Sequence, residues 1–489
     1  MTLPVILVAL PLVIALAVYI LPEARRPLAL AGSAGVLAAV VATGQHLMAA
    51  GPWRYPIGGW ETPPGIALSV DALAVVMLGM TAVVAAGATV YALGYWRGPE
   101  RGRGVDMKER AFWPLWWMLW AGLNALFLAG DAFNAYVCLE VVGLSAVALV
   151  AVAGEGPALR AALRYLLVSL AGSLLYLAGV ALLYGEYAVL DLEALGEAVE
   201  SGWLPATSLA LASAGLALKT ALFPLHFWLP PAHGHAPAPV SAVLSALVVK
   251  GGLYLLLRYW AGVFAALDQA WGALLLAALG AVAVVWGSFQ ALAATRLKLL
   301  VAYSTVAQLG YLFLAFPLVV DPHTAVLGRE ALLYLVLAHA LAKGAAFLAA
   351  GTLLWATGTD RIADLGGVLP SFPVTTAAFA LAGVSLIGLP PTGGFVGKWL
   401  LLEGLIASGL WAGLAVVAAG TFLASGYVFR VLVHTFRAEG QTAAPILTVQ
   451  HRPGRVMEWT ALGLALAALG VGFLAPVLEP VLAAAGRGL

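Results

Sequence analysis

The sequence has little charge and almost no cysteine. Only 10% of its 489 residues are charged and 63% are hydrophobic, whereas soluble domains carry roughly 25% charged residues. A soluble fold could not bury so much apolar surface away from water, so we expect an integral membrane protein. The net charge of +1 excludes the basic footprint of a nucleic-acid-binding domain. The one cysteine, Cys138, excludes a disulfide within the chain.

Several cofactor motifs are also missing. The sequence contains no GxxxxGK[ST], GxGxxG or CxxC pattern, so nothing indicates a nucleotide, a flavin or an iron–sulfur cluster. We expect no cofactor and no redox or hydrolytic site in this chain. His226, His233 and His235 cluster together. The HGH motif lies between prolines in a predicted loop without a fixed scaffold, so we expect no metal site there.

Long apolar runs, by contrast, are abundant. A helix needs about 20 apolar residues to cross a bilayer, and about fourteen segments qualify. They lie at 3–21, 27–50, 70–96, 111–129, 132–153, 160–184, 205–229, 240–262, 269–294, 297–319, 330–356, 373–409 (interrupted), 411–437 and 457–481. The first lacks a basic n-region and is expected to be a retained span. Residues 51–70 are expected to form an external hairpin or loop.

Basic residues are unevenly distributed over the loops. Loops after even-numbered spans hold only Arg54, Arg258 and Arg329. Loops after odd-numbered spans hold Arg25, Arg26, Arg97, Arg101, Arg103, Lys108, Arg110, Arg160, Arg164, Arg296, Lys298, Arg361, Arg430, Arg437, Arg452 and Arg455. The positive-inside rule then predicts a multi-pass protein of the inner (cytoplasmic) membrane with both termini on the outer side.

Lysine is rare, and its placement is unusual. Lys108 and Lys298 fall in predicted loops, but the other lysines lie inside hydrophobic segments; they are Lys219, Lys250, Lys343 and Lys398. A lysine at a helix centre costs about 3 kcal/mol on insertion scales. One such lysine could be a structural residue bonded to carbonyls of a neighbouring helix. Four of them indicate a function.

Other titratable residues accompany these lysines. Glu140 lies inside the fifth span, and His339 is spaced i,i+4 from Lys343 on one helix face. Alone, each would be read as a packing residue. Burial disfavours the charged form of a lysine and a nearby carboxylate favours it, so such a row could pass protons along a wet path. His226 and His233 are candidates for proton uptake.

Two spans are interrupted, and each has a lysine beside the break. The interruptions are FPLHFWLPP and SLIGLPPTGGFVGKWLLLEG. Broken backbone at membrane depth must be buried in protein or line a wet cavity. Two breaks five spans apart predict an internal repeat of spans 4–8 and 9–13. The expected organisation is 1–110, a first repeat 111–262, a second repeat 269–437, and a last span within 438–489.

At this point the sequence resembles a known family. The motifs GDAFNAYVCLEVVGLS, ALKTALFPLHFWLPPAH, APAPVSAVLSALVVKGGLY, KLLVAYSTVAQLGY, HALAKGAAFLAAG and GLPPTGGFVGKWLLL closely resemble the antiporter-like subunits of respiratory complex I, membrane hydrogenases and Mrp-type cation/proton antiporters. The resemblance covers about residues 65–435. It implies an all-α membrane protein with fourteen spans, two inverted five-helix repeats, broken helices 7 and 12, and one proton channel.

The resemblance also implies roles for individual residues. Glu140 resembles the family's fifth-span glutamate, Lys219 its seventh-span partner and Lys250 the eighth-span lysine. His339 and Lys343 resemble the central pair, and Lys398 the exit residue. Two positions depart from the pattern, because Arg296 stands where the family often has an acid and Gln308 where some members have a histidine.

Four functional hypotheses follow. The leading one is a proton-channel subunit of a multisubunit Mrp-type Na⁺/H⁺ antiporter, closest to the D-type subunit, which LLYGEYAVLDLEAL also resembles. The second is a proton-pumping subunit of a redox-driven complex, part of a translocase such as NADH-quinone oxidoreductase. The third is a membrane subunit of an inorganic-carbon uptake system. Four buried lysines argue against the fourth, a scaffold. The expected partners are related membrane subunits, protons, Na⁺ and the bilayer.

Overall fold

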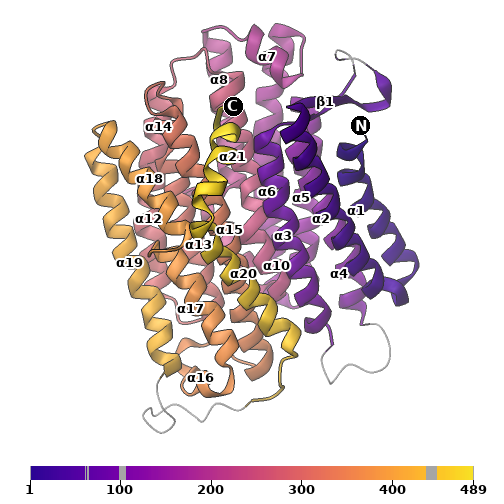
Figure 1. Ribbon diagram of the computed structural model, residues 1–489, viewed down its shortest axis with the longest axis vertical. Coiled ribbons are helices and arrows are strands. Elements are labelled where there is room, and N and C mark those ends of the chain that lie inside the picture. Colours follow the sequence, from indigo (N-terminus) through magenta and orange to yellow (C-terminus); the bar gives the residue numbers. More distant parts are fainter. Residues whose placement is uncertain (1, 61, 63–64, 98–105, 437–448, 488–489) are drawn as a thin grey trace.

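The computed structural model describes residues 2–60, 62, 65–97, 106–436 and 449–487. The predicted loop residues Arg101, Arg103 and Arg437 lie outside them. Within the described residues the chain is a bundle of helices with one small hairpin (Figure 1). The predicted all-α membrane fold is therefore confirmed.

Twelve helical segments among the described residues are long and apolar enough to cross a membrane. Eight are single helices: α1 (Leu3–Ile20), α2 (Arg25–Ala50), α3 (Ala72–Tyr95), α4 (Met107–Leu128), α5 (Ala132–Ala151), α6 (Gly156–Tyr187), α12 (Ala270–Ala293) and α15 (Ala325–Thr357). Two further single helices are α19 (Trp411–Phe436) and α20 (Arg455–Phe473). Each matches a predicted span within a few residues, except that α20 ends earlier than predicted.

The other two of the twelve contain local irregularities. One joins α10 (Ala238–Val243), the π-helix η4 (Leu244–Val248), α11 (Val249–Arg258) and the π-helix η5 (Tyr259–Val263). The other joins α13 (Leu297–Leu314) to α14 (Phe316–Val320). A π-helix widens one turn and changes which carbonyls are free to accept hydrogen bonds.

The two remaining crossings are broken where the prolines predict. In the seventh, α8 (Trp203–Lys219) stops, and the chain resumes as the 3₁₀ turn η3 (Leu225–Trp228) and α9 (Leu229–His235). In the twelfth, α17 (Pro373–Ile387) is followed by α18 (Gly393–Ala407). Thr392 caps α18 by accepting a hydrogen bond from the Phe395 backbone N–H.

Short elements connect the helices. The predicted hairpin is formed by β1 (Trp53–Pro56) and β2 (Ala67–Val70), which pair antiparallel. The others are η1 (Pro22–Ala24), η2 (Ile57–Gly59), α7 (Leu192–Ala198), η6 (Ile362–Asp364), α16 (Val368–Ser371) and α21 (Ala475–Arg487). The last span ends at Phe473 rather than at 481, because Pro476 cannot donate to the preceding turn and starts a new helix instead.

The bundle has two distinct ends (Figure 1). The N- and C-terminal ends lie at the end that carries β1 and α7, and α16 lies at the opposite end. We call these the hairpin face and the basic face, since Arg25, Lys108, Arg296 and Arg361 lie in or beside the connections at the latter.

Two isolated β-bridges show the internal repeat. Asp131, between α4 and α5, pairs with Asp191, which follows α6. Arg296, between α12 and α13, pairs with Arg361, which follows α15. The first bridge lies towards α7 on the hairpin face and the second towards α16 on the basic face (Figure 1). The same three-helix arrangement thus occurs twice with opposite orientation.

Small residues let helices approach closely beside the first break. A Cβ on Gly172 of α6 would lie 2.8 Å from the backbone oxygen of Gly215 in α8. Real side chains essentially never approach a backbone atom so closely. Such small-residue contacts are typical of helix packing in membranes.

This contact generates a stability prediction. Gly172→Ala forces α6 away from α8, and overpacking of this kind costs about 1–3 kcal/mol. We expect a lower melting temperature of the detergent-solubilised protein. Gly185→Ala in the same helix is the control, because a Cβ there meets nothing within 4 Å. Equal melting temperatures for the two variants would contradict the close contact.

Candidate functional site

Glu140 and Lys219 meet beside the first helix break. Glu140 projects from α5 and Lys219 is the last residue of α8, and Lys219 Nζ lies 3.8 Å from Glu140 Oε1. Two serines of α6 complete the group. Lys219 Nζ donates to Ser169 Oγ at 3.1 Å, and Ser173 Oγ donates to the Glu140 carboxylate. The predicted acid–base pair is thus in contact, with a hydroxyl on each member.

A glycine leaves room for the side chains of Ser169 and Lys219. A Cβ on Gly143 of α5 would lie 2.7 Å from Ser169 Oγ and 3.7 Å from Lys219 Nζ. A cavity of about 20 Å³ also touches Lys219, Gly143, Val248 and Gly252. Because that is room for about one water molecule, a water could join Lys219 to the helix that carries Lys250.

The serines of α6 correspond to the central pair of the second repeat. Ser169 and Ser173 precede the bridging Asp191 by as many residues as His339 and Lys343 precede the bridging Arg361. The two helices therefore present side chains at matching positions. The sequence analysis does not predict a role for the serines. Their i,i+4 spacing in an apolar helix is the signal that could have indicated one.

Lys250 contacts His339 directly. Lys250 Nζ lies 2.5 Å from His339 Nδ1 and donates to the Ser245 carbonyl oxygen at 2.5 Å. Ser245 belongs to the π-helix η4, so the irregular turn supplies this oxygen. Both side chains are buried. The ring nitrogen that faces the amine accepts a hydrogen bond whenever the amine is protonated.

Lys343 lies one turn further along α15. Its Nζ donates to the Val301 carbonyl oxygen at 3.0 Å and to Ser304 Oγ, both on α13. The side chain is fully buried. The structure thus brings Lys250, His339 and Lys343 into one group between the two repeats.

Lys398 is placed by the second break. Its Nζ donates to the Ile387 carbonyl oxygen at 2.9 Å and to Thr421 Oγ1 of α19 at 3.2 Å. Ile387 is the last residue of α17, so the break leaves its carbonyl free. The amine also lies 4.4 Å from the centre of the Tyr311 ring, a favourable cation–π position.

Gln308 shares a carbonyl oxygen with Lys398, a contact that the sequence pattern does not indicate. Its Nε2 donates to the Leu386 carbonyl oxygen at 2.9 Å, the oxygen that Lys398 Nζ approaches at 3.4 Å. Gln308 also lies one turn beyond Ser304 on α13, and Ser304 binds Lys343.

The structure corrects two placements. The HGH motif is not a loop, because His233 and His235 lie in α9, which Pro230 and Pro231 open in the first-turn positions that proline tolerates. His233 is fully buried, and His226 in η3 is nearly so. Lys298 is not in a loop either, because α13 begins at Leu297 and its second residue is only 2% exposed. The protein therefore has a fifth buried lysine where the sequence predicts a loop residue.

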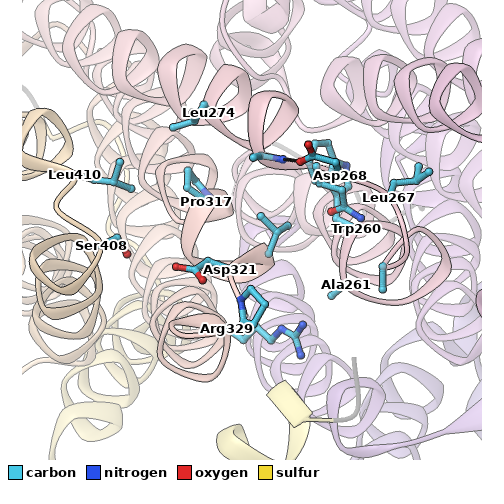
Figure 2. A pocket seen from close by; sticks show the side chains of 15 residues that line it. Trp260, Ala261, Leu267, Asp268, Leu274, Pro317, Asp321, Arg329, Ser408 and Leu410 are labelled. Atoms are coloured by element: carbon cyan, nitrogen blue, oxygen red, sulfur yellow. Dashed lines mark hydrogen bonds between the residues drawn. The ribbon is translucent and has the colours of Figure 1, made fainter. Parts of the chain in front are cut away.

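One sizeable cavity lies away from this row. It measures about 570 Å³ and opens between the ends of α12, α14 and α18, with Asp268, Asp321 and Arg329 among its lining residues (Figure 2). None of the predicted site residues lines it. A cavity of about 290 Å³ at the hairpin face contains the Arg258–Asp71 ion pair, whose atoms are 2.5 Å apart.

The side chains of this site can donate or accept protons. They are amines, an imidazole and hydroxyls that lie between Glu140 at one end and Lys398 at the other, and all of them exchange protons readily. Glu140 is the one carboxylate that contacts these amines in the part of the chain that the structure describes. The lysines are therefore not locked in permanent ion pairs.

Comparison with known proteins agrees with this geometry. Residues 129–424 match the family described as NADH:quinone oxidoreductase/Mrp antiporter, TM. The chain is 38% identical to NADH-quinone oxidoreductase subunit N of Desulforudis audaxviator (strain MP104C) over 443 residues, which cover 89% of this chain and 86% of that protein. It is 30% identical to the D-type Na(+)/H(+) antiporter subunit of Bacillus subtilis (strain 168) over 387 residues, with 78% and 76% covered.

Solved structures share the whole fold. A chain of the membrane-bound sulfane sulfur reductase, an archaeal respiratory membrane complex, superposes with a TM-score of 0.89 at 26% identity, covering 100% of this chain and 97% of that one. The resemblance seen in the sequence is therefore confirmed. The chain belongs to the NADH:quinone oxidoreductase/Mrp antiporter transmembrane family.

Proposed function

We propose that the chain is a proton-translocating subunit of a multisubunit Mrp-type cation/proton antiporter. One observation carries the proposal: Lys219, Lys250, Lys343 and Lys398 lie inside the bundle, and hydroxyls, an imidazole and an amide lie beside them. Buried ionisable groups in membrane segments are costly and mark ion or proton paths. A scaffold would have no use for them.

The Glu140–Lys219 contact acts as the gate. While the carboxylate stays close, it favours the charged amine, and Lys219 keeps its proton. When the two separate, burial favours the neutral amine, and the proton leaves towards Lys250 through the water-sized cavity. The contact at 3.8 Å is loose enough for a small shift of α8 at its broken end to open it.

The proton then crosses to the second repeat. Lys250 passes it to His339, and His339 to Lys343 one turn away on the same helix. From Lys343 the route follows Ser304 and Gln308, one turn apart on α13, to Lys398, the exit residue. The second break supplies backbone oxygens there and gives water a place at membrane depth.

Orientation and surroundings complete the proposal. The basic face is cytoplasmic by the positive-inside rule, which puts both termini on the outer side of the inner (cytoplasmic) membrane. Protons enter from the basic face near His226 and His233. Residues 111–262 and 269–437 form the two repeats, flanked by 1–110 and 438–489. Further membrane subunits of the complex, including related antiporter-like ones, would cover the exposed helix faces.

A second candidate is a proton-pumping subunit of a redox-driven complex. The 38% identity to a NADH-quinone oxidoreductase subunit favours it. The purified native complex distinguishes the two. An Mrp-type antiporter moves protons when a Na⁺ gradient is imposed, whereas a redox-driven pump needs an electron donor and acceptor and contains redox subunits.

Variants of the central and exit residues test the path itself. Lys343→Ala and Lys398→Ala should each abolish proton flux in the assembled complex, because each removes the amine that links its neighbours in the row. His339→Ala should slow flux but leave a measurable rate, since water can bridge the missing imidazole. Arg361→Met is the control, because its side chain is exposed on the basic face. Flux is measured in proteoliposomes with a pH-sensitive dye. A normal rate for assembled Lys343→Ala would refute the proposed function.

The gate gives a double-mutant prediction. Glu140→Gln and Lys219→Ala should each reduce flux steeply, because each removes one half of the pair. The double variant should be little worse than either single one, since residues that act as a unit are strongly non-additive. Measuring flux for wild type, both single variants and the double variant completes the cycle. Independent, multiplicative losses would mean that Glu140 and Lys219 do not act as a pair.

A further inference from the structure

A polar cavity opens at the basic face between the two repeats. It measures about 370 Å³. Charged and titratable side chains gather in its wall, among them Glu155, His235, Arg296 and Lys298. The wall also includes Ala236, Pro237 and Ala238, the turn that connects α9 to α10. The cavity therefore reaches the broken seventh span from the basic face.

Lys298 lines this cavity. Its side chain is almost completely buried, and its Nζ donates to the Ala236 carbonyl oxygen at 2.5 Å. Ala236 follows α9, so its carbonyl is free to accept. Ser241 Oγ reaches the same oxygen at 3.3 Å and the His233 carbonyl oxygen at 2.9 Å. Three hydrogen bonds thus connect Lys298 to the backbone of His233.

His233 is oriented as a proton acceptor. Its Nδ1 lies 3.1 Å from the Ser241 carbonyl oxygen. A carbonyl oxygen can only accept, so Nδ1 carries the hydrogen, and Nε2 of the neutral ring keeps its lone pair. Nε2 is buried and has no hydrogen-bond partner among the described residues. A buried polar atom left in this way calls for an explanation.

The position of His233 supplies that explanation. Its ring stacks on Phe347 with 5.0 Å between centroids, and Phe347 lies one turn beyond Lys343 on α15. Lys298, Lys343 and Lys250 all act electrostatically on His233. The imidazole therefore stands between the lysine of the cavity and the central lysines of the row.

Asp360 offers Lys298 a second position. Its Oδ1 accepts from Arg296 Nε at 2.8 Å, while Oδ2 is buried without a partner in the described part of the chain. Asp360 is the strongest charged influence on Lys298. The family's usual acid before this lysine is replaced by Arg296, and the arginine holds Asp360 in place.

We propose that Lys298 is the loading lysine of the proton path, taking protons from the basic-face cavity and delivering them to His233. The inference rests on the proposed function and adds a residue to it. Lys298 gives up one proton and becomes a neutral amine, and His233 Nε2 takes that proton, so the ring becomes an imidazolium. His233 then releases the Nε2 proton towards Lys343 and Lys250. Cavity water reprotonates Lys298, and Asp360 attracts the new ammonium.

A purely structural role makes a different prediction. If Lys298 only tethers the α9–α10 turn, any cation that can donate to Ala236 will serve. Arginine keeps the charge and the donors but does not release its proton in proteins. Lys298→Arg therefore separates a proton carrier from an anchor.

The experiment uses the assembled complex in proteoliposomes. Lys298→Ala and Lys298→Arg should each lower proton flux by at least about tenfold. Methylamine should restore flux to Lys298→Ala, because the cavity admits a small amine that carries a proton. Tetramethylammonium, which has the charge but no proton to give, should not. Arg361→Met, an exposed cation lost from the same face, should change flux less than about twofold.

The outcomes are distinct. Normal flux in Lys298→Arg, or rescue of Lys298→Ala by tetramethylammonium, would show an anchor and overturn the inference. Equal loss in Arg361→Met would show a general charge effect and overturn it as well. Lys343→Ala is measured in parallel, because a normal rate there refutes the proposed function itself. If Lys298→Ala does not assemble, Lys298→Arg alone decides between carrier and anchor.

Discussion

A protonated amine inside a membrane protein needs oxygen ligands, and a regular helix offers few. Each helical carbonyl already accepts a backbone hydrogen bond, so free oxygens occur where the helix is interrupted. Three buried lysines lie at such places. Lys250 binds the Ser245 oxygen of a π-helix, Lys298 the Ala236 oxygen between two helices, and Lys398 the Ile387 oxygen at a break. The irregular backbone and the buried lysines therefore depend on each other.

Corresponding helices of the two repeats, α6 and α15, present different kinds of side chain. In the first repeat, α6 presents Ser169 and Ser173, which hold a lysine and a glutamate that come from other helices. In the second, α15 presents His339 and Lys343 at the corresponding positions, so the titratable groups belong to the helix itself. The first arrangement can separate, because its two charges lie on different elements. The second is fixed, because its two groups share one helix.

The sequence predicts most of the fold, because apolar length and proline position determine the spans, both breaks and the hairpin directly. It could not place Lys298, because a lysine four residues after the end of one predicted span and at the very start of the next looks like a loop residue, and only the packing of α13 against the α9–α10 turn buries it. His233 was misplaced for a related reason, since proline breaks a helix from inside but starts one at its first turn. The contact of Gln308 could not be predicted for a different reason. Its amide and Lys398 Nζ both approach the Leu386 carbonyl oxygen. The pattern of residue types along one helix does not show which oxygen on another helix a side chain reaches.

The short distance between Lys250 and His339 constrains how protons can move. With 2.5 Å between Nζ and Nδ1, two charged groups would repel strongly, because like charges in contact disfavour joint protonation. Lys343 stands one turn from the same imidazole, so it belongs to the same electrostatic unit. A proton that arrives at one member must displace the charge from its neighbour. In the proposed path, the central group would therefore pass charge on step by step, and Glu140, which favours a charged amine at the first end of the row, would determine when the first step can begin.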